Sequence, residues 1–243
     1  FAPWAEMHQY TGSRRGKEAS ASSSELRSDE EYSWIPWFCS LKGNEFFCEV
    51  EDSYVQDTFN LTGLDSMIPY YDNALDLILD IESRDDMLSD DQQEMLENDA
   101  ETLFGLIHAR FIITNRGLQR MLVKYREKQF GVCPNVLCRD QPVLPMGLSD
   151  QLNEESVKLY CPKCDDIYEP QKSRHEHIDG AFFGKTFPHL FFLTYPELKP
   201  KPLTEKYVPK VFGYKVNKEA FKKSLEAQEK AMKEKTKAKL LRR

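Results

Sequence analysis

The amino-acid sequence predicts an α+β protein in which an all-helical N-terminal domain precedes a small β domain and an extended C-terminal segment. Up to residue 128, apolar side chains recur at three- and four-residue steps, as on the buried face of helices. After Phe130, five prolines interrupt the chain, and Val157–Tyr160 alternates as a strand does. A further proline-containing stretch then leads to a short alternating segment.

The predicted boundaries follow these changes in composition. Residues 1–33 are rich in Ser, Gly and charge. They offer too little apolar surface to offset the entropy lost on ordering, so we expect a disordered segment. The remaining parts are a helical domain at 34–128, a β domain at 129–195, a C-terminal segment at 196–216 and a basic tail at 217–243.

Two short helices are expected before residue 82. The first is Tyr54–Leu61, which Thr62 and Gly63 would stop. Pro69 suits the first turn of the second, because a fixed φ and a missing N–H cost nothing there. The apolar positions of this second helix follow the helical period: Ala74, Leu75, Ile78, Leu79 and Ile81.

A long helix is expected to begin after Ser89. Ser89 and Gln92 have the spacing of a capping box, in which each side chain bonds the other residue's backbone N–H. We expect a break at residues 115–117 and a final helix ending at Tyr125. His108 lies on the long helix, where a histidine is most often a satisfied core residue. The predicted buried stripe of this helix is Leu96, Ala100, Leu103, Ile107 and Phe111.

Charge is distributed unevenly. Residues 76–101 hold eleven acidic residues and one basic residue, whereas residues 218–243 hold ten basic and four acidic residues. The net charge of −7 argues against a generic nucleic-acid binder. No apolar run approaches the roughly 20 residues needed to span a bilayer, and no apolar signal segment begins the sequence. We therefore expect an intracellular protein that is not inserted in a membrane.

Four cysteines form two close pairs. Cys133 and Cys138 are followed, after 22 intervening residues, by Cys161 and Cys164. Four thiolates in two tight turns can converge on Zn²⁺ as a tetrahedron with Zn–S bonds of about 2.3 Å. A filled shell leaves no place for an activated water, so the site would be structural, and metal binding would supply folding energy to a β domain too small to fold alone. Two disulfides, or a redox-active pair at Cys161 and Cys164, remain as alternatives.

The remaining sulfur and imidazole groups carry weaker signals. Cys39 and Cys48 are expected to be ordinary buried or half-buried thiols. His175 and His177 lie in a basic stretch that predicts a surface turn, with a second metal site as the alternative. The aromatic-rich stretch 182–193 has no helix cap, and we expect it to pack between the metal unit and its neighbours or to form an interface.

The alternating segment 207–216 carries Phe212 and Tyr214, which would point the same way if extended. It is either a terminal strand of its own domain or a hairpin whose aromatic anchors dock on another protein. No pattern predicts catalysis, since G-x-G-x-x-G is absent and Gln129–Gly131 lacks the Asp that a kinase uses for Mg²⁺. No catalytic residue is predicted.

Five longer motifs are far more specific than the cysteine spacing: Trp34–Val50, Phe59–Leu64, Gly105–Arg110, Thr114–Gly117 and Lys158–Cys164. Together they resemble the regulatory (beta) subunit of casein kinase II. The resemblance covers residues 22–216. It implies a zinc ribbon that pairs two chains into a homodimer, on which two kinase catalytic subunits dock.

The function that this resemblance implies is that of a non-catalytic subunit, which stabilises the kinase and modulates its choice of substrate. The alternative is a zinc-ribbon nucleic-acid-binding adaptor, although the excess of acidic residues around the ribbon argues against phosphate binding. A zinc hydrolase is disfavoured by the filled coordination shell.

The resemblance also implies roles for particular residues. The zinc ligands would be Cys133, Cys138, Cys161 and Cys164. The dimer contact would flank the cysteine turns at Pro134, Val136, Ile167 and Tyr168. The family's catalytic-subunit anchors are a Tyr and a Phe separated by Gly, and here the two aromatics are exchanged. The catalytic subunit would bind Leu190, Val211, Phe212 and Tyr214.

The resemblance also implies roles for two further regions, one acidic and one rich in serine. An acidic regulatory loop would attract protein substrates or polyamines through Asp80, Glu82, Asp85, Asp86, Asp90 and Asp91. Autophosphorylation would fall on Ser22, Ser23, Ser24 and Ser28. A location in nucleus and cytoplasm is implied as well. Neither residues 1–20 nor the basic tail fits the family pattern.

Overall fold

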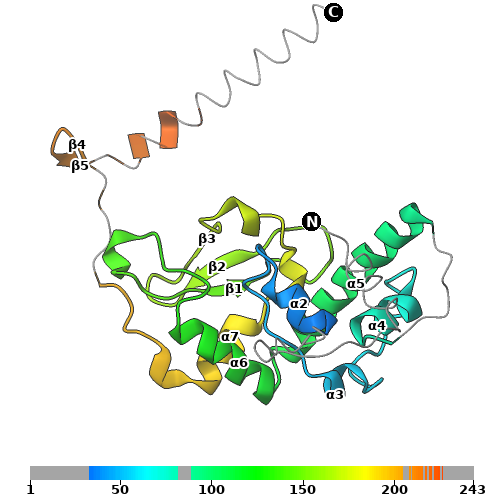
Figure 1. Ribbon diagram of the computed structural model, residues 1–243. Helices are drawn as coiled ribbons and strands as arrows, with labels where there is room; N and C mark the ends of the chain where they lie inside the picture. Colours follow the sequence, from blue (N-terminus) through cyan, green and yellow to red (C-terminus); the bar gives the residue numbers. More distant parts are fainter. Residues whose placement is uncertain are drawn as a thin grey trace, which may run out of the picture. The chain divides into compact units, whose positions relative to one another are not determined.

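The computed structural model describes residues 33–81 and 89–204, and beyond them residues 208, 210–215, 217, 219–220, 222–224 and 226 (Figure 1). The chain divides into two compact units, the first ending at Pro202 and the second beginning at Leu203. No helix in the described ranges combines the length and apolarity needed to cross a bilayer.

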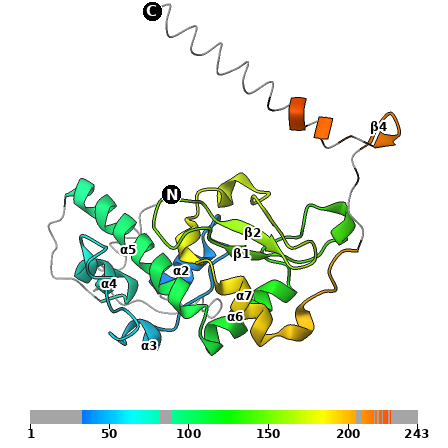
Figure 2. The same ribbon diagram turned by 180° about the vertical axis from the view of Figure 1, so that it is seen from behind.

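Helices dominate the first part of the first unit. α5 carries the predicted capping box at Ser89, and the whole predicted stripe from Leu96 to Phe111 is buried. The shorter α4 packs along α5, as both views show (Figures 1 and 2). The helices are α2 (Trp34–Ser40), α3 (Asp52–Val55), α4 (Tyr71–Ile78), α5 (Asp90–Phe111) and α6 (Asn115–Arg126).

A three-stranded antiparallel sheet follows, in the order β1-β2-β3. Pro145 lies opposite Leu159, and Tyr160 lies opposite Ile167. α7 packs against β1. The strands are β1 (Leu144–Met146), β2 (Lys158–Cys161) and β3 (Asp166–Tyr168); the helices are α7 (Phe187–Thr194) and the 3₁₀ turns η1 (Val136–Cys138), η2 (Ser173–His175), η3 (Gly180–Phe182) and η4 (Pro196–Leu198). This mixture of helices and a small sheet confirms the α+β class.

The described part of the second unit contains a two-stranded hairpin, β4 (Lys210–Val211) and β5 (Tyr214–Lys215). Its two-residue turn consists of Phe212 at φ 49° and Gly213 at φ 86°. Positive φ at both positions is the signature of a type I′ turn, whose twist matches that of the flanking strands. The segment is therefore a hairpin, one of the two predicted alternatives. Because Phe212 lies in its turn and Tyr214 begins β5, the two aromatic residues do not share the extended geometry in which they would point the same way.

An aromatic cluster joins the helices to the segment that follows the sheet. Phe47 lies 5.5 Å from Phe183 between ring centroids, and His108 on α5 lies 5.2 Å from the same ring. His108 is fully buried, and its Nε2 accepts the Cys48 N–H at 3.2 Å while its Nδ1 lies 2.9 Å from the Phe182 carbonyl oxygen. The prediction that His108 is a satisfied core residue is confirmed.

Several predicted elements are wrong in detail. The helix expected at 54–61 is the four-residue α3, and residues 58–63 form turns. The break between the helices lies just before residues 115–117, not within them. The Thr114 side chain accepts the Gly117 N–H, and residues 115–117 form the first turn of α6. Ile81 is exposed beyond the end of α4.

Three further corrections concern segments whose local signals were weak. The uncapped aromatic stretch contains α7, which forms without a side-chain cap because its apolar residues are buried against α6 and the sheet. α2 was not predicted as a helix. His175 is buried against Phe46 and bonded to Glu45, whereas His177 is exposed as predicted.

The buried imidazole makes stability sensitive to acid. Burial lowers the pKa of His108 from its usual value near 6.5 to about 4. The unfolded chain therefore takes up a proton between these values that the folded chain refuses, so stability is kept above pH 6.5 and lost as the pH falls. We expect this group to remove about 2 kcal/mol between pH 7 and pH 5.

Urea unfolding of the parent and of His108→Gln at both pH values measures this contribution. Glutamine can donate and accept hydrogen bonds as the neutral ring does, but it does not titrate. The contributions of all other titrating groups therefore cancel when the pH dependence of the variant's free energy of unfolding is subtracted from that of the parent. Equal pH dependence of the two proteins would contradict the assignment.

Candidate metal centre

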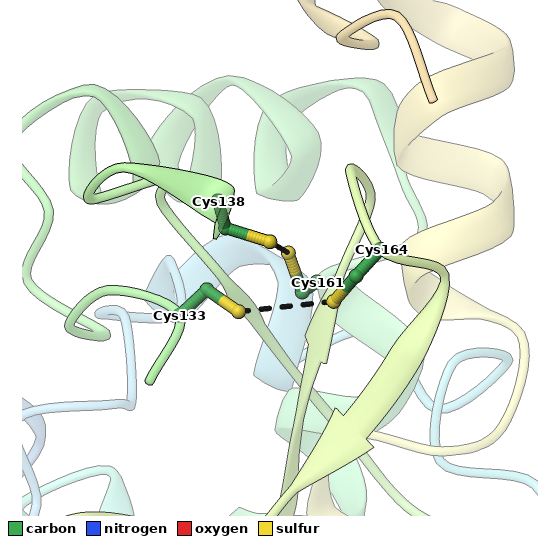
Figure 3. A group of neighbouring side chains, drawn as sticks. All are labelled: Cys133, Cys138, Cys161 and Cys164. Carbon is green, nitrogen blue, oxygen red and sulfur yellow. Dashed lines mark hydrogen bonds between the residues drawn. The ribbon is translucent and has the colours of Figure 1, made fainter. Parts of the chain in front are cut away.

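The four paired cysteines lie together at one end of the sheet (Figure 3). Cys138 ends the 3₁₀ turn η1, and Cys133 precedes it. Cys161 ends β2, and Cys164 lies in the turn between β2 and β3. The four sulfur atoms all lie within 4.8 Å of one another.

Local hydrogen bonds shape the two turns that carry these sulfurs. In the first, the Asn135 side chain accepts the Leu137 N–H at 3.0 Å, and the Asn135 carbonyl accepts the Cys138 N–H at 2.8 Å. In the second, the Asp165 N–H donates to the Cys161 carbonyl at 3.0 Å, with Asp165 in the left-handed region. These hydrogen bonds shape each turn locally, and the Lys163 ammonium in the second turn donates to the Cys138 carbonyl at 2.9 Å, which joins the two turns.

The sulfur separations fit a metal ion better than disulfides. The Sγ atoms of Cys133 and Cys164 are 3.8 Å apart, as are those of Cys138 and Cys161. A tetrahedral shell with Zn–S bonds of about 2.3 Å has sulfur–sulfur edges of about 3.8 Å, whereas a disulfide needs about 2.05 Å. All six cysteines of the chain are free thiols.

Burial opposes the ionisation of two of the four thiols. Burial raises the pKa of Cys138 to about 12, and it also raises the pKa of Cys161. A divalent cation reverses this tendency, because it stabilises the thiolates that bind it. Four sulfur donors can therefore hold one metal ion here, and they fill a tetrahedral shell, which leaves no open position for catalysis.

Comparison with known proteins decides the family. The sequence profile described as casein kinase II regulatory subunit matches residues 33–215. The chain belongs to the casein kinase II regulatory subunit family. The match begins where the described helices begin and ends at the last residue of β5, so it includes both the cysteine cluster and the hairpin.

Curated relatives agree with this membership. The casein kinase II subunit beta of Dictyostelium discoideum is 50% identical over 217 residues, which cover 89% of this chain and 81% of the relative. The corresponding subunit of Schizosaccharomyces pombe is 53% identical, covering 80% and 84%. The casein kinase II subunit beta′ of Drosophila melanogaster is 50% identical, covering 84% and 92%.

As a member of the casein kinase II regulatory subunit family, the chain is a non-catalytic kinase subunit. This membership confirms the predicted resemblance and the absence of an enzymatic role. It also favours the regulatory role over the nucleic-acid adaptor, which the cysteine pattern alone had left open.

The residues predicted to bind the catalytic subunit lie in both units. Val211, Phe212 and Tyr214 come together on the β4–β5 hairpin, where Phe212 is 96% exposed and Tyr214 is 80% exposed. Leu190 lies on α7 of the first unit and is also exposed.

The residues predicted for the dimer contact flank the cysteine turns. Val136 is 88% exposed, Pro134 and Ile167 are exposed, and Tyr168 is half-buried with its hydroxyl 3.3 Å from the Cys164 sulfur. Within the described ranges, therefore, apolar side chains face solvent beside the metal centre.

The predicted acidic loop contains one residue with an additional structural role. Both carboxylate oxygens of Asp80 lie within 3.1 Å of the Trp34 N–H, at the start of α2. Asp90 and Asp91 are exposed in the first turn of α5. Glu82, Asp85 and Asp86 lie outside the described residues, as do Ser22, Ser23, Ser24 and Ser28.

Sequence reasoning missed this role of Asp80 and the ion pairs of Glu45. The Glu45 carboxylate lies 2.6 Å from an Arg174 nitrogen and 2.7 Å from His175 Nε2. No sequence signal could have found these contacts, because about 130 residues separate the partners and no local spacing relates them.

Loss of one sulfur ligand tests the metal centre. We expect the purified protein to carry one equivalent of zinc, and Cys138→Ser to lose most of it together with several kcal/mol of folding free energy. Elemental analysis and urea unfolding measure the two effects.

The matched control is Cys39→Ser, which changes a thiol that is not in the cluster. It should keep its zinc. Unchanged zinc content in Cys138→Ser, or equal loss in both variants, would refute the assignment of the four ligands.

Proposed function

We propose that this chain forms a zinc-stabilised homodimer that binds two casein kinase II catalytic subunits, stabilises them and modulates their choice of substrate. The observation that carries the proposal is the family match over residues 33–215. Kinase chemistry would be supplied entirely by the partner, and this chain would act by binding one arrangement of that partner more tightly than others.

Zinc is the metal that the four-sulfur cluster fits best. Four buried or half-buried thiols at tetrahedral spacing form a closed structural site. The strands beside it are only three or four residues long, so they bury little apolar surface of their own. Zinc binding would therefore be the main source of stability for the ribbon.

The β4–β5 hairpin is the candidate docking element. A hairpin of two-residue strands is marginal in isolation, yet it presents Phe212 and Tyr214 almost entirely to solvent. Phe212 also sits at positive φ, which is costly for a bulky residue and typical of functional positions. Aromatic anchors of this kind provide much of the free energy in protein interfaces.

The apolar residues beside the cysteine turns are the candidate dimer contact. Val136 and Ile167 are exposed beside the two cysteine turns, since η1 forms part of the first turn and β3 follows the second. A two-fold axis through such a patch would bury the same residues on both chains. The ribbon would then join two kinase-binding chains.

The charged regions would add recruitment and regulation. Asp90 and Asp91, with the acidic residues that precede them in the sequence, would attract polyamines or basic substrates. The N-terminal serines would be sites of autophosphorylation. We place the protein in nucleus and cytoplasm.

Calorimetric titration with a casein kinase II catalytic subunit tests docking. The zinc-loaded parent should bind one kinase per chain. Phe212→Ala/Tyr214→Ala should weaken binding about 100-fold or more, because two central aromatic anchors are removed. Phe59→Ala is the control, since Phe59 is an equally exposed aromatic (83%) in the first unit.

Absence of binding by the zinc-loaded parent would refute the regulatory function proposed for this chain. Binding that survives the double substitution would keep the function but assign docking to other residues. Equal weakening by Phe59→Ala would show that the effect is not specific to the hairpin.

Dimerisation is tested separately by Val136→Asp. In a two-fold contact this change brings two carboxylates into one apolar patch, so the dimer should dissociate at concentrations where the parent stays dimeric. Analytical ultracentrifugation measures the change.

Val123→Asp, at an exposed valine on α6, is the matched control and should leave the dimer intact. A dimer that persists in Val136→Asp would show that the dimer contact lies at other residues. A monomeric parent would refute the proposed dimer.

A further inference from the structure

A small cavity lies where the end of α6 meets the stretch around η2. Its volume is about 80 Å³. Because one water occupies about 30 Å³ of liquid, this is room for a group of a few heavy atoms and not for a nucleotide. Its apolar lining includes Phe46, Phe130 and Leu159, and its basic lining consists of Lys128, Lys172 and His175.

The histidine is buried, and only one of its two ring nitrogens has a hydrogen-bond partner among the described residues. His175 is 4% exposed, and its ring packs on Phe46 with centroids 4.1 Å apart. Nε2 lies 2.7 Å from Glu45, which accepts only, so Nε2 carries the hydrogen of that bond. Among the described residues Nδ1 has no hydrogen-bond partner. A ring nitrogen of this buried, cavity-lining residue is thus left without a hydrogen-bond partner among the described residues.

The ammonium groups of the two lysines in the lining also lack partners among the described residues. Within the part of the chain that the structure describes, neither the Lys128 nor the Lys172 ammonium forms an ion pair or a hydrogen bond. Lys128 is held at the cavity by a left-handed backbone turn, in which its carbonyl accepts the Gly131 N–H at 2.9 Å. Both side chains are therefore free to close on a ligand.

Nearby acidic groups do not cancel these charges. Glu45 is already bonded by Arg174 and by the Gly43 N–H as well as by His175, and despite the opposing effect of burial these bonds lower its pKa to about 2. Its single charge is matched by the Arg174 guanidinium. The Nε–H of Arg174 is itself buried without an acceptor. The cavity is thus left with two unbalanced positive charges.

Glu127, which precedes Lys128 in the chain, is a second acidic group near the lining. Its carboxylate accepts a hydrogen bond from Gln129 Nε2 at 2.6 Å, and Gln129 in turn accepts from Lys124. This exposed chain lies along the end of α6 and includes neither Lys128 nor Lys172.

We propose that this cavity is a binding site for a phosphoryl group. A dianion of a few heavy atoms matches its size and the charge of two ammonium groups, and lysine binds phosphate as a point charge. The free Nδ1 of His175 can accept the hydrogen of hydrogenphosphate or, once protonated, donate to a phosphate oxygen. A carboxylate would leave one lysine unmatched.

Titration of the zinc-loaded full chain with inorganic phosphate at constant ionic strength tests the site. Ring ¹⁵N–¹H correlations report on each histidine separately. The His175 signals should shift saturably, while those of His189, which is exposed on α7, should not.

Matched pairs of substitutions distinguish a specific phosphate site from general electrostatic attraction to positive charge. Lys128→Ala/Lys172→Ala should weaken phosphate binding about tenfold or more, because two close charges are lost. Lys199→Ala/Lys201→Ala removes the same charge from two other exposed lysines of the first unit and should leave the affinity unchanged. His175→Gln, a smaller change, should weaken binding without loss of zinc.

Phosphoserine and serine identify the source of the group. Saturable binding of phosphoserine but not serine would support a phosphorylated side chain as the ligand. Binding of phosphate without phosphoserine would support the free ion. Absence of a saturable shift at His175, or equal weakening by the two lysine pairs, would overturn the proposal.

Discussion

One neutral imidazole ties the interior of the first unit together. His108 projects from α5, takes the Cys48 N–H on one ring nitrogen and gives a hydrogen to the Phe182 carbonyl with the other. Because the ring is wholly buried, both backbone groups would lose their partner if the ring turned, and the Cys48 N–H would lose its acceptor if the ring became charged. The aromatic rings around it are therefore held in one register, and the chain leading out of the ribbon is fixed to the helical part.

The metal centre is built on a different principle. Its two turns are shaped by local hydrogen bonds, and its sulfurs converge because β2 brings the second turn beside the first. Such a site needs few apolar residues nearby. Val136 and Ile167 are therefore not needed in a hydrophobic core, and both face solvent. These exposed apolar residues are the ones at which we propose the dimer contact.

The hairpin of the second unit contrasts with both. Its strands are two residues long, and its described residues are exposed. Little of the chain's own structure opposes its ordering against a partner, so the free energy of binding would come from the aromatic side chains themselves. The first unit thus has a packed interior, whereas the hairpin would gain burial only by docking on the proposed partner.

The sequence by itself determined several features that depend on local spacing. The capping box at Ser89, the buried stripe of α5 and the four cysteines could be read directly, because each depends on residues a few positions apart. The long motifs around Trp34 and Lys158 were enough to predict the family, which the match over residues 33–215 confirmed.

Only the tertiary structure decided the rest. α7 has no cap and α2 no strong periodicity, so burial against distant residues, not local preference, makes them helical. Asp80 at the start of α2 and His175 beside Glu45 read as surface residues, because their partners lie 46 and 130 positions away. Pairings over such separations leave no trace in local spacing, so only the folded structure could show them.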